Sequence, residues 1–154
     1  MRIDLMRITA YFIISLLIFG CSATSIPQEF TFYDSHGIIY HSSTATQNAK
    51  MEYGLDQEPR LIIIATSSEN EKKFKKQMRI IYNVNAEQMQ YMYVVANSEE
   101  EDHSGYYATK STAKKLLDGN SFKIIIYNGK GKLITQSQEV IGEQKLVDLL
   151  TRDS

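Results

Sequence analysis

The sequence predicts an α/β fold built on a mixed four-stranded sheet with helices on both faces. A run of mostly β-branched residues at positions 60–66 is typical of a strand that is covered on both faces. A helical pattern follows this run and leads to a second apolar run, which is the order of a parallel β-α-β unit. Later in the chain, Asn128-Gly129 separates two further strand-like runs and indicates an antiparallel hairpin.

The first residues have the parts of an export signal. Arg2 and Arg7 give a positively charged start, residues 8–19 are mostly apolar, and the small residue Gly20 comes directly before Cys21. The apolar run is shorter than the roughly 20 residues that a membrane-spanning helix needs. We therefore expect residues 1–20 to be a signal peptide of the lipoprotein type, with an uncleaved anchor as the alternative.

Cys21 is the only cysteine of the chain, so it cannot form an internal disulfide. The stretch "LIFGC" resembles the bacterial lipobox, in which signal peptidase cuts before a cysteine that carries diacylglycerol. The resemblance implies lipidation of Cys21, and a further amide-linked chain such as palmitate would make the anchoring stable. An ordinary secretory signal with an incidental cysteine is the alternative.

These features predict a protein of the bacterial cell envelope that is held in a membrane by the lipid on Cys21. Ser22 follows the cysteine, which by analogy with enterobacterial sorting favours the outer membrane, facing the periplasm. Without Arg2, Arg7 and Asp4, the 17 basic and 18 acidic residues leave a formal charge of −2. A nucleic-acid-binding domain needs a clearly basic face, so we expect no nucleic acid partner.

The segment before the main sheet divides into two parts. Residues 21–28 are small and polar, as in a tether, and residues 29–59 contain a short hairpin followed by a connection. The hairpin is predicted from "EFTFYD" and "GIIYHS", with a turn at Asp34–Gly37 between them. Residues 43–59 lack periodicity and end in Pro59, which predicts an irregular connection that could include a short helical turn.

The domain proper is predicted at residues 60–154. After the strand at 60–66, Ser68 and Glu71 have the spacing of a capping box, so Ser68 is the predicted N-cap of the next helix. Glu69 and Glu71 would then lie in its first turn, near the positive end of the helix dipole. The apolar stripe of this helix, over residues 72–82, comprises Phe74, Met78, Ile81 and Tyr82.

The remaining elements alternate in the same manner. Residues 88–96 form a second predicted strand, and residues 111–120 a short helix with Thr109 or Ser111 as its cap and Gly119 as its stop. Two strands follow around Asn128-Gly129, and a helix closes the chain. Its apolar side comprises Ile141, Leu146, Leu149 and Leu150.

The resulting order, β-α-β-α-β-β-α, is the thioredoxin-like arrangement. From about Arg60 onward the chain resembles domain-of-unknown-function family 4174, whose members are thioredoxin-like and often exported. The matching stretches are "RLIIIATSSENEKKF" and "FKIIIYNGKGKLI" with a helix after it. No established activity comes with that family, so the resemblance implies a fold and little chemistry.

A thioredoxin-type oxidoreductase needs a low-pKa thiolate at a helix N-terminus and a second cysteine that resolves the mixed disulfide. Here residues 66–69 are Thr-Ser-Ser-Glu, and "GNSF" at residues 119–122 lacks the proline that this fold usually carries before its hairpin strand. A serine nucleophile at Ser67 or Ser68 would need a base held by a third group. We predict no catalytic residue and no cofactor, and we interpret Ser68 as a cap.

Two groups of residues could be taken for metal sites. His36 and His41 lie near Asp34, and residues 99–103 place four carboxylates next to a histidine. The second group lacks the ligand spacing of an EF-hand loop. We therefore predict surface histidines and a solvated acidic loop, so no metal site is assigned. Weak divalent-cation binding is the minority interpretation, with candidate ligands Glu99, Glu100, Glu101, Asp102 and His103.

Three functional hypotheses follow from the sequence. The first is a lipid-anchored binding or assembly module of the envelope, with a protein partner and no enzymatic activity. The alternative is a non-redox, metal-dependent enzyme that uses the acidic loop 99–103. The third is a module that docks a redox partner through its thioredoxin-like face without chemistry of its own.

Overall fold

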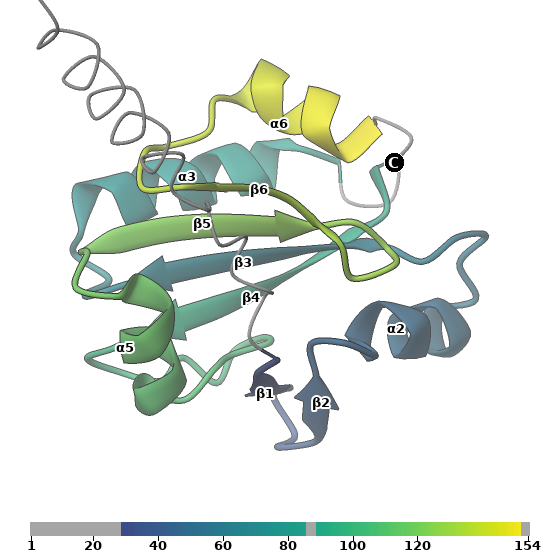
Figure 1. Ribbon diagram of the computed structural model, residues 1–154, viewed down its shortest axis with the longest axis horizontal. Coiled ribbons are helices and arrows are strands. Elements are labelled where there is room, and N and C mark those ends of the chain that lie inside the picture. Colours follow the sequence, from purple (N-terminus) through teal and green to yellow (C-terminus); the bar gives the residue numbers. More distant parts are fainter. Residues whose placement is uncertain (1–28, 86–88, 152–154) are drawn as a thin grey trace, which may run out of the picture.

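The computed structural model describes residues 29–85 and 89–151 (Figure 1). The predicted signal peptide, Cys21 and the predicted tether lie outside the described residues. None of the described helices is long and apolar enough to cross a membrane. The elements in chain order are β1 (Thr31–Tyr33), β2 (Ile39–His41), α2 (Ala45–Tyr53), β3 (Arg60–Thr66), α3 (Lys72–Asn83), β4 (Tyr91–Asn97), α5 (Lys110–Leu117), β5 (Phe122–Tyr127), β6 (Leu133–Ser137) and α6 (Glu143–Thr151).

The main sheet has the strand order β4-β3-β5-β6. β3 runs parallel to β4 and antiparallel to β5, and β5 runs antiparallel to β6. In this register Ile63 lies between Val94 on one side and Ile125 on the other. The predicted mixed four-stranded sheet is confirmed, including the parallel first pair and the antiparallel last pair.

Alternate residues of the central strand β3 serve two separate cores. Leu61 and Ile63 pack on the face that carries α2, α5 and the hairpin β1–β2, whereas Ile62 and Ile64 pack beneath α3 and α6. Figure 1 shows these two layers on opposite sides of the sheet. All seven residues of β3 are buried, as expected for a strand that is covered on both faces.

The predicted N-terminal hairpin is confirmed, with β1 paired antiparallel to β2. Phe32 is fully buried; its ring stacks on Tyr40 with centroids 5.5 Å apart and meets the edge of Tyr106 at 5.7 Å. Tyr107 exchanges two backbone hydrogen bonds of 2.8 Å with Tyr33 and forms a bridge to Val95 of β4. The hairpin is therefore attached to the main domain through both its aromatic core and its backbone.

The connection predicted at residues 43–59 contains a nine-residue helix, α2, so the prediction of an irregular segment with at most a short helical turn is wrong. The helix buries only small side chains, Ala45, Thr46 and Ala49, while Met51 and Tyr53 are exposed. Such a helix leaves no apolar stripe in the sequence. It ends at Gly54, whose left-handed backbone suits a residue without Cβ.

The start of α3 differs from the prediction. The helix begins at Lys72, and its N-cap is Glu71, whose Oε2 accepts a hydrogen bond of 2.9 Å from the Phe74 N–H. Ser68 lies outside the helix, where its Oγ accepts from the Asn70 N–H at 3.3 Å. The predicted Ser68 cap is therefore wrong, and so is the placing of Glu69 and Glu71 in the first turn. Tyr82, assigned to the apolar stripe, is 69% exposed.

The N-cap of α5 is as predicted, but the helix ends at Leu117 and not at the predicted residue 120. Thr109 is its N-cap and accepts a hydrogen bond from the Thr112 N–H, as one of the two predicted caps. The helix stops at Leu117, after which Asp118 and Gly119 both have left-handed backbone, with φ of 49° and 82°. β4 begins at Tyr91, later than the predicted 88.

The β5–β6 hairpin is confirmed, but its turn is longer than a two-residue Asn-Gly turn. The Asn128 N–H donates to the Lys132 carbonyl, and the left-handed position is Gly131, with φ of +74°. Gly129 has a different role. A Cβ at this position would lie 2.5 Å from the Glu58 carbonyl oxygen. The turn thus packs against the segment that precedes β3.

Replacing Gly129 by alanine is expected to destabilise the protein by about 1–3 kcal/mol, because the backbone of residue 58 must move to admit the methyl group. Urea unfolding of the full-length protein measures this loss. Gly105→Ala is the matched control, because a Cβ at Gly105 meets no atom within 4 Å. Equal stability of the two variants would show that the contact between the turn and Glu58 is dispensable.

Candidate functional site

The junction between β3 and α3 contains Ser67 and Ser68, the two serines considered above as nucleophiles. The Thr66 Oγ1 donates to the Ser68 carbonyl at 2.7 Å and accepts from the Ser68 N–H at 3.3 Å. The Ser67 N–H donates to the Ser121 carbonyl at 2.8 Å, which ties the junction to the start of β5. No hydrogen bond among the described residues joins Ser67 or Ser68 to a histidine. The polar groups of this junction therefore shape a turn.

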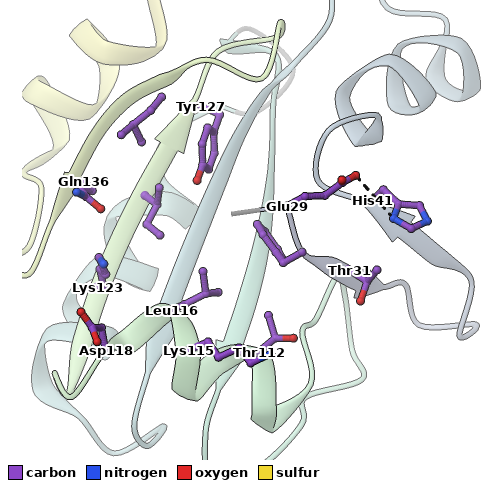
Figure 2. A pocket seen from close by; sticks show the side chains of 13 residues that line it. Glu29, Thr31, His41, Thr112, Lys115, Leu116, Asp118, Lys123, Tyr127 and Gln136 are labelled. Carbon is purple, nitrogen blue, oxygen red and sulfur yellow. Dashed lines mark ion pairs between the residues drawn. The ribbon is translucent and has the colours of Figure 1, made fainter. Parts of the chain in front are cut away.

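A pocket of about 670 Å³ lies between the hairpin, α5 and the β5–β6 part of the sheet (Figure 2). Its volume is within the range of about 300–1,000 Å³ that is usual for small-molecule sites. We call it the hairpin–α5 pocket. It is lined by Glu29, Phe30, Thr31, His41, Thr112, Lys115, Leu116, Asp118, Lys123, Ile125, Tyr127, Leu133 and Gln136.

The pocket exists because α5 covers only part of its face of the sheet. The helix packs mainly against β3 and β4 and only partly against β5, so it leaves the rest of this face of β5 and β6 uncovered. Ile125 and Tyr127 form the floor, and burial raises the pKa of the Tyr127 hydroxyl. Leu133 of β6 and Leu116 of α5 are half-buried beside them. The floor is thus apolar and already formed.

Charged side chains stand around this apolar floor. Figure 2 shows Lys115 and Asp118 at the α5 side, Lys123 on the sheet, and Glu29 with His41 on the hairpin. Glu29 Oε1 accepts a hydrogen bond of 2.6 Å from the Ser43 hydroxyl and lies 3.9 Å from His41 Nδ1. An apolar floor with a charged rim is suited to binding an amphipathic ligand.

The acidic loop supports the start of α5. The Oε1 of Glu101 accepts a hydrogen bond of 3.1 Å from the N–H of Lys110, the first residue of the helix. A carboxylate is favourable there because the helix N-terminus carries a partial positive charge. Asp102 accepts from the Ser104 N–H at 2.9 Å, and the His103 ring lies 4.2 Å from that of Tyr107. Glu99 and Glu100 are exposed.

The other two histidines have separate surroundings. His36 lies 3.9 Å from Asp34 in the hairpin turn, and His41 lies beside Glu29. Asp34 Oδ1 accepts from the N–H groups of His36 and Ile38, both at 2.9 Å. Slight burial acts to raise the pKa of Asp34, but these hydrogen bonds outweigh it and leave the pKa lowered. Within residues 29–85 and 89–151, no three His, Cys, Asp or Glu side chains are grouped so that they could hold a metal ion.

No protein-family model matches the sequence, and no curated protein matches it either. Solved structures do match. Yeast Sco1 has a TM-score of 0.53 at 11% identity, over 82% of this chain and 92% of that chain. A candidate electron transfer protein from Aquifex aeolicus VF5 has a TM-score of 0.52 at 13% identity, over 81% and 89%. A conserved protein of unknown function from Bacteroides fragilis has a TM-score of 0.51 at 11% identity, over 80% of this chain and 95% of that chain.

The fold is thioredoxin-like. The order and directions of the four strands and the neighbours above agree on this point. At identities of 11–13% the likeness extends to the fold alone, so it carries no activity to this chain. The resemblance to family 4174 stays a prediction.

The sequence did not indicate the hairpin–α5 pocket. Its lining comes from the hairpin, from one face of α5 and from two strands, and these residues share no motif. Phe30 and Thr31 are more than 80 positions away from Leu116 along the chain. No local sequence signal could have indicated it, because the pocket arises from the packing of the hairpin against α5 and the sheet.

Proposed function

We propose that this chain is a lipid-anchored binding or assembly module of the bacterial envelope, with a thioredoxin-like domain that does not carry out thiol chemistry. The anchor is the lipid on Cys21, in the outer membrane facing the periplasm. The observation that carries the binding role is the hairpin–α5 pocket, an apolar floor with a charged rim.

The composition of the junction supports the non-redox part of the proposal. Cys21 is the only cysteine of the chain, and the junction residues after β3 are serines. A serine hydroxyl cannot form the mixed disulfide through which thiol–disulfide exchange proceeds. The Thr66 hydroxyl at the same junction donates a hydrogen bond to the Ser68 carbonyl, so this hydroxyl is part of the turn.

Introducing a charge into the pocket is expected to abolish partner binding. Leu116→Glu places a carboxylate over the apolar floor formed by Ile125 and Tyr127. Chemical cross-linking in intact cells, followed by purification of the full-length protein, should give a cross-linked species that this variant loses. Lys145→Glu, on the exposed side of α6, is the control and should keep it. If both variants cross-link as the wild type does, the pocket is not the binding site.

The metal-dependent enzyme is tested separately, because Glu101 and Asp102 already have structural hydrogen bonds. The quadruple variant with Gln at Glu99, Glu100 and Glu101 and Asn at Asp102 removes the charge of the acidic loop. Hydrolytic activity is screened with Mg²⁺, Mn²⁺ and Zn²⁺ for the wild type and this variant. If the wild type shows a metal-dependent activity that the folded variant lacks, the enzyme hypothesis is correct and the binding-module hypothesis is wrong.

A further inference from the structure

We propose that the outer edge of β6 binds an extended peptide of a protein partner, which adds a fifth strand to the sheet and inserts apolar side chains into the hairpin–α5 pocket. The peptide is acidic on both sides of its apolar centre. This inference rests on the proposed function and names the chemistry of the partner.

β6 is the end strand of the sheet, and its far edge has no strand beside it within the described residues. In an antiparallel pair every second residue directs its N–H and C=O away from the partner strand, so this edge offers free donors and acceptors. Natural proteins commonly protect such edges with lysine or proline. The five residues of β6, Leu-Ile-Thr-Gln-Ser, contain neither.

The opposite edge of the sheet is less open. At β4, the Val95 N–H donates to the Tyr106 carbonyl and the Val95 carbonyl accepts from the Ala108 N–H, both at 3.0 Å. The segment 106–108 therefore already occupies the middle of that edge. At β6 no described strand occupies the edge, although the register with β5 shifts between Thr135 and Leu133, so the regular part of this edge is the end from Thr135 to Ser137.

The pocket lies directly beside this edge. Leu133 and Gln136 of β6 belong to its lining, together with Ile125 and Tyr127 of the adjacent strand. Gln136 pairs with Ile125, and Leu133 pairs with Tyr127, so these side chains share one face of the sheet. An added strand would direct alternate side chains to the same face. Its apolar residues can therefore reach the pocket while its backbone bonds to β6.

The charges around β6 determine the composition of the peptide. Lys130 and Lys132 precede the strand, while Lys123 lies one residue before Ile124, the partner of Ser137 at its other end. Lys115 on α5 adds a further positive charge to the pocket. The lining also contains two carboxylates: Glu29, which already accepts a hydrogen bond from Ser43, and Asp118, whose negative charge is outnumbered by the positive charges of Lys115 and Lys123. Lysines at both ends of the strand complement a peptide with acidic flanks.

The probe is a labelled peptide, Asp-Asp-Val-Thr-Val-Asp-Asp, blocked at both ends. Its binding to the full-length protein in detergent is measured by fluorescence anisotropy at low salt. We expect this peptide to bind at least about tenfold more tightly than Lys-Lys-Val-Thr-Val-Lys-Lys. Methylation of its three central amide nitrogens removes the strand donors and should weaken binding by about tenfold or more.

A pair of matched charge reversals locates the site. The double substitution Lys123→Glu with Lys132→Glu should lower the affinity for the acidic probe by about tenfold, because two attractions between opposite charges become repulsions. Lys72→Glu with Lys76→Glu, at exposed positions of α3, should leave binding unchanged. If the first pair impairs folding, Lys132→Glu alone, at an exposed position, makes the same comparison.

Absence of probe binding, equal binding of the acidic and basic peptides, or equal binding of the methylated peptide would each overturn the proposal. A β6-to-β6 contact between two copies would also overturn it, and would appear as a dimer that the probe does not dissociate. If the probe fails but the Leu116→Glu variant still loses its cross-linked species, the binding module stands and only the peptide mode is wrong. If the probe does not bind and the Leu116→Glu variant cross-links as the wild type does, both the peptide mode and the binding module are wrong.

Discussion

Replacing Cys21 by serine is expected to transfer the protein from the membrane fraction to the soluble fraction and to abolish its labelling by palmitate. The effect should be close to complete, because the lipid on Cys21 is the proposed anchor. Three acyl chains on one cysteine exceed the two signals that stable anchoring needs. Cell fractionation and growth with labelled palmitate measure the two effects.

Ser25→Ala, in the predicted tether, is the control for this substitution and should keep both label and membrane location. The result that contradicts lipid anchoring is a Cys21→Ser protein that remains in the membrane at its full precursor length. In that case residues 1–20 would act as an uncleaved anchor, which is the alternative that the sequence left open.

Replacing Phe32 by alanine is expected to lower the free energy of unfolding by about 3–5 kcal/mol, the usual cost of removing a buried phenylalanine. Phe32 is fully buried and holds Tyr40 and Tyr106 in ring contacts of 5.5 and 5.7 Å. Losing this ring removes the centre of the aromatic cluster that attaches the hairpin to the domain. Because Glu29, Phe30, Thr31 and His41 line the pocket, peptide binding should fall as well.

Urea unfolding gives the change in stability, and amide exchange of residues 31–41 reports whether the hairpin has detached. Ile39→Ala is the matched control: Ile39 lies on the same hairpin but is 57% exposed, so its loss should cost no more than about 0.5 kcal/mol. A Phe32→Ala protein within about 1 kcal/mol of the wild type would show that the hairpin is not a structural part of the domain.

The main sheet could be predicted because its strands carry strong local signals. Residues 60–66 are buried on both faces, so nearly every position must be apolar and the run is unmistakable. The Asn128-Gly129 pair marked the last hairpin correctly, although Gly131 holds the left-handed position. The parallel direction of the first two strands followed from the helix between them.

Other features could not be predicted because tertiary contacts decide them. α2 buries two alanines and a threonine, which carry too little apolar surface to produce a periodic pattern. At the start of α3, the sequence indicates Ser68 as the cap and Glu71 as its capping-box partner. In the structure the hydrogen bonds of the buried Thr66 hold Ser68 in a turn before the helix, and Glu71 is the cap. The pocket depends on how the hairpin sits against α5, which no local pattern contains.

The most direct test of the binding module places a photo-reactive amino acid either at Leu116 in the pocket or at Ser67 at the strand-to-helix junction. Each full-length protein is expressed in cells, illuminated, and analysed for covalent adducts. We predict a specific adduct from position 116 and none from position 67, since the proposed binding site is the hairpin–α5 pocket. An adduct from position 67 with none from position 116 would contradict it and would assign docking to the thioredoxin-like face.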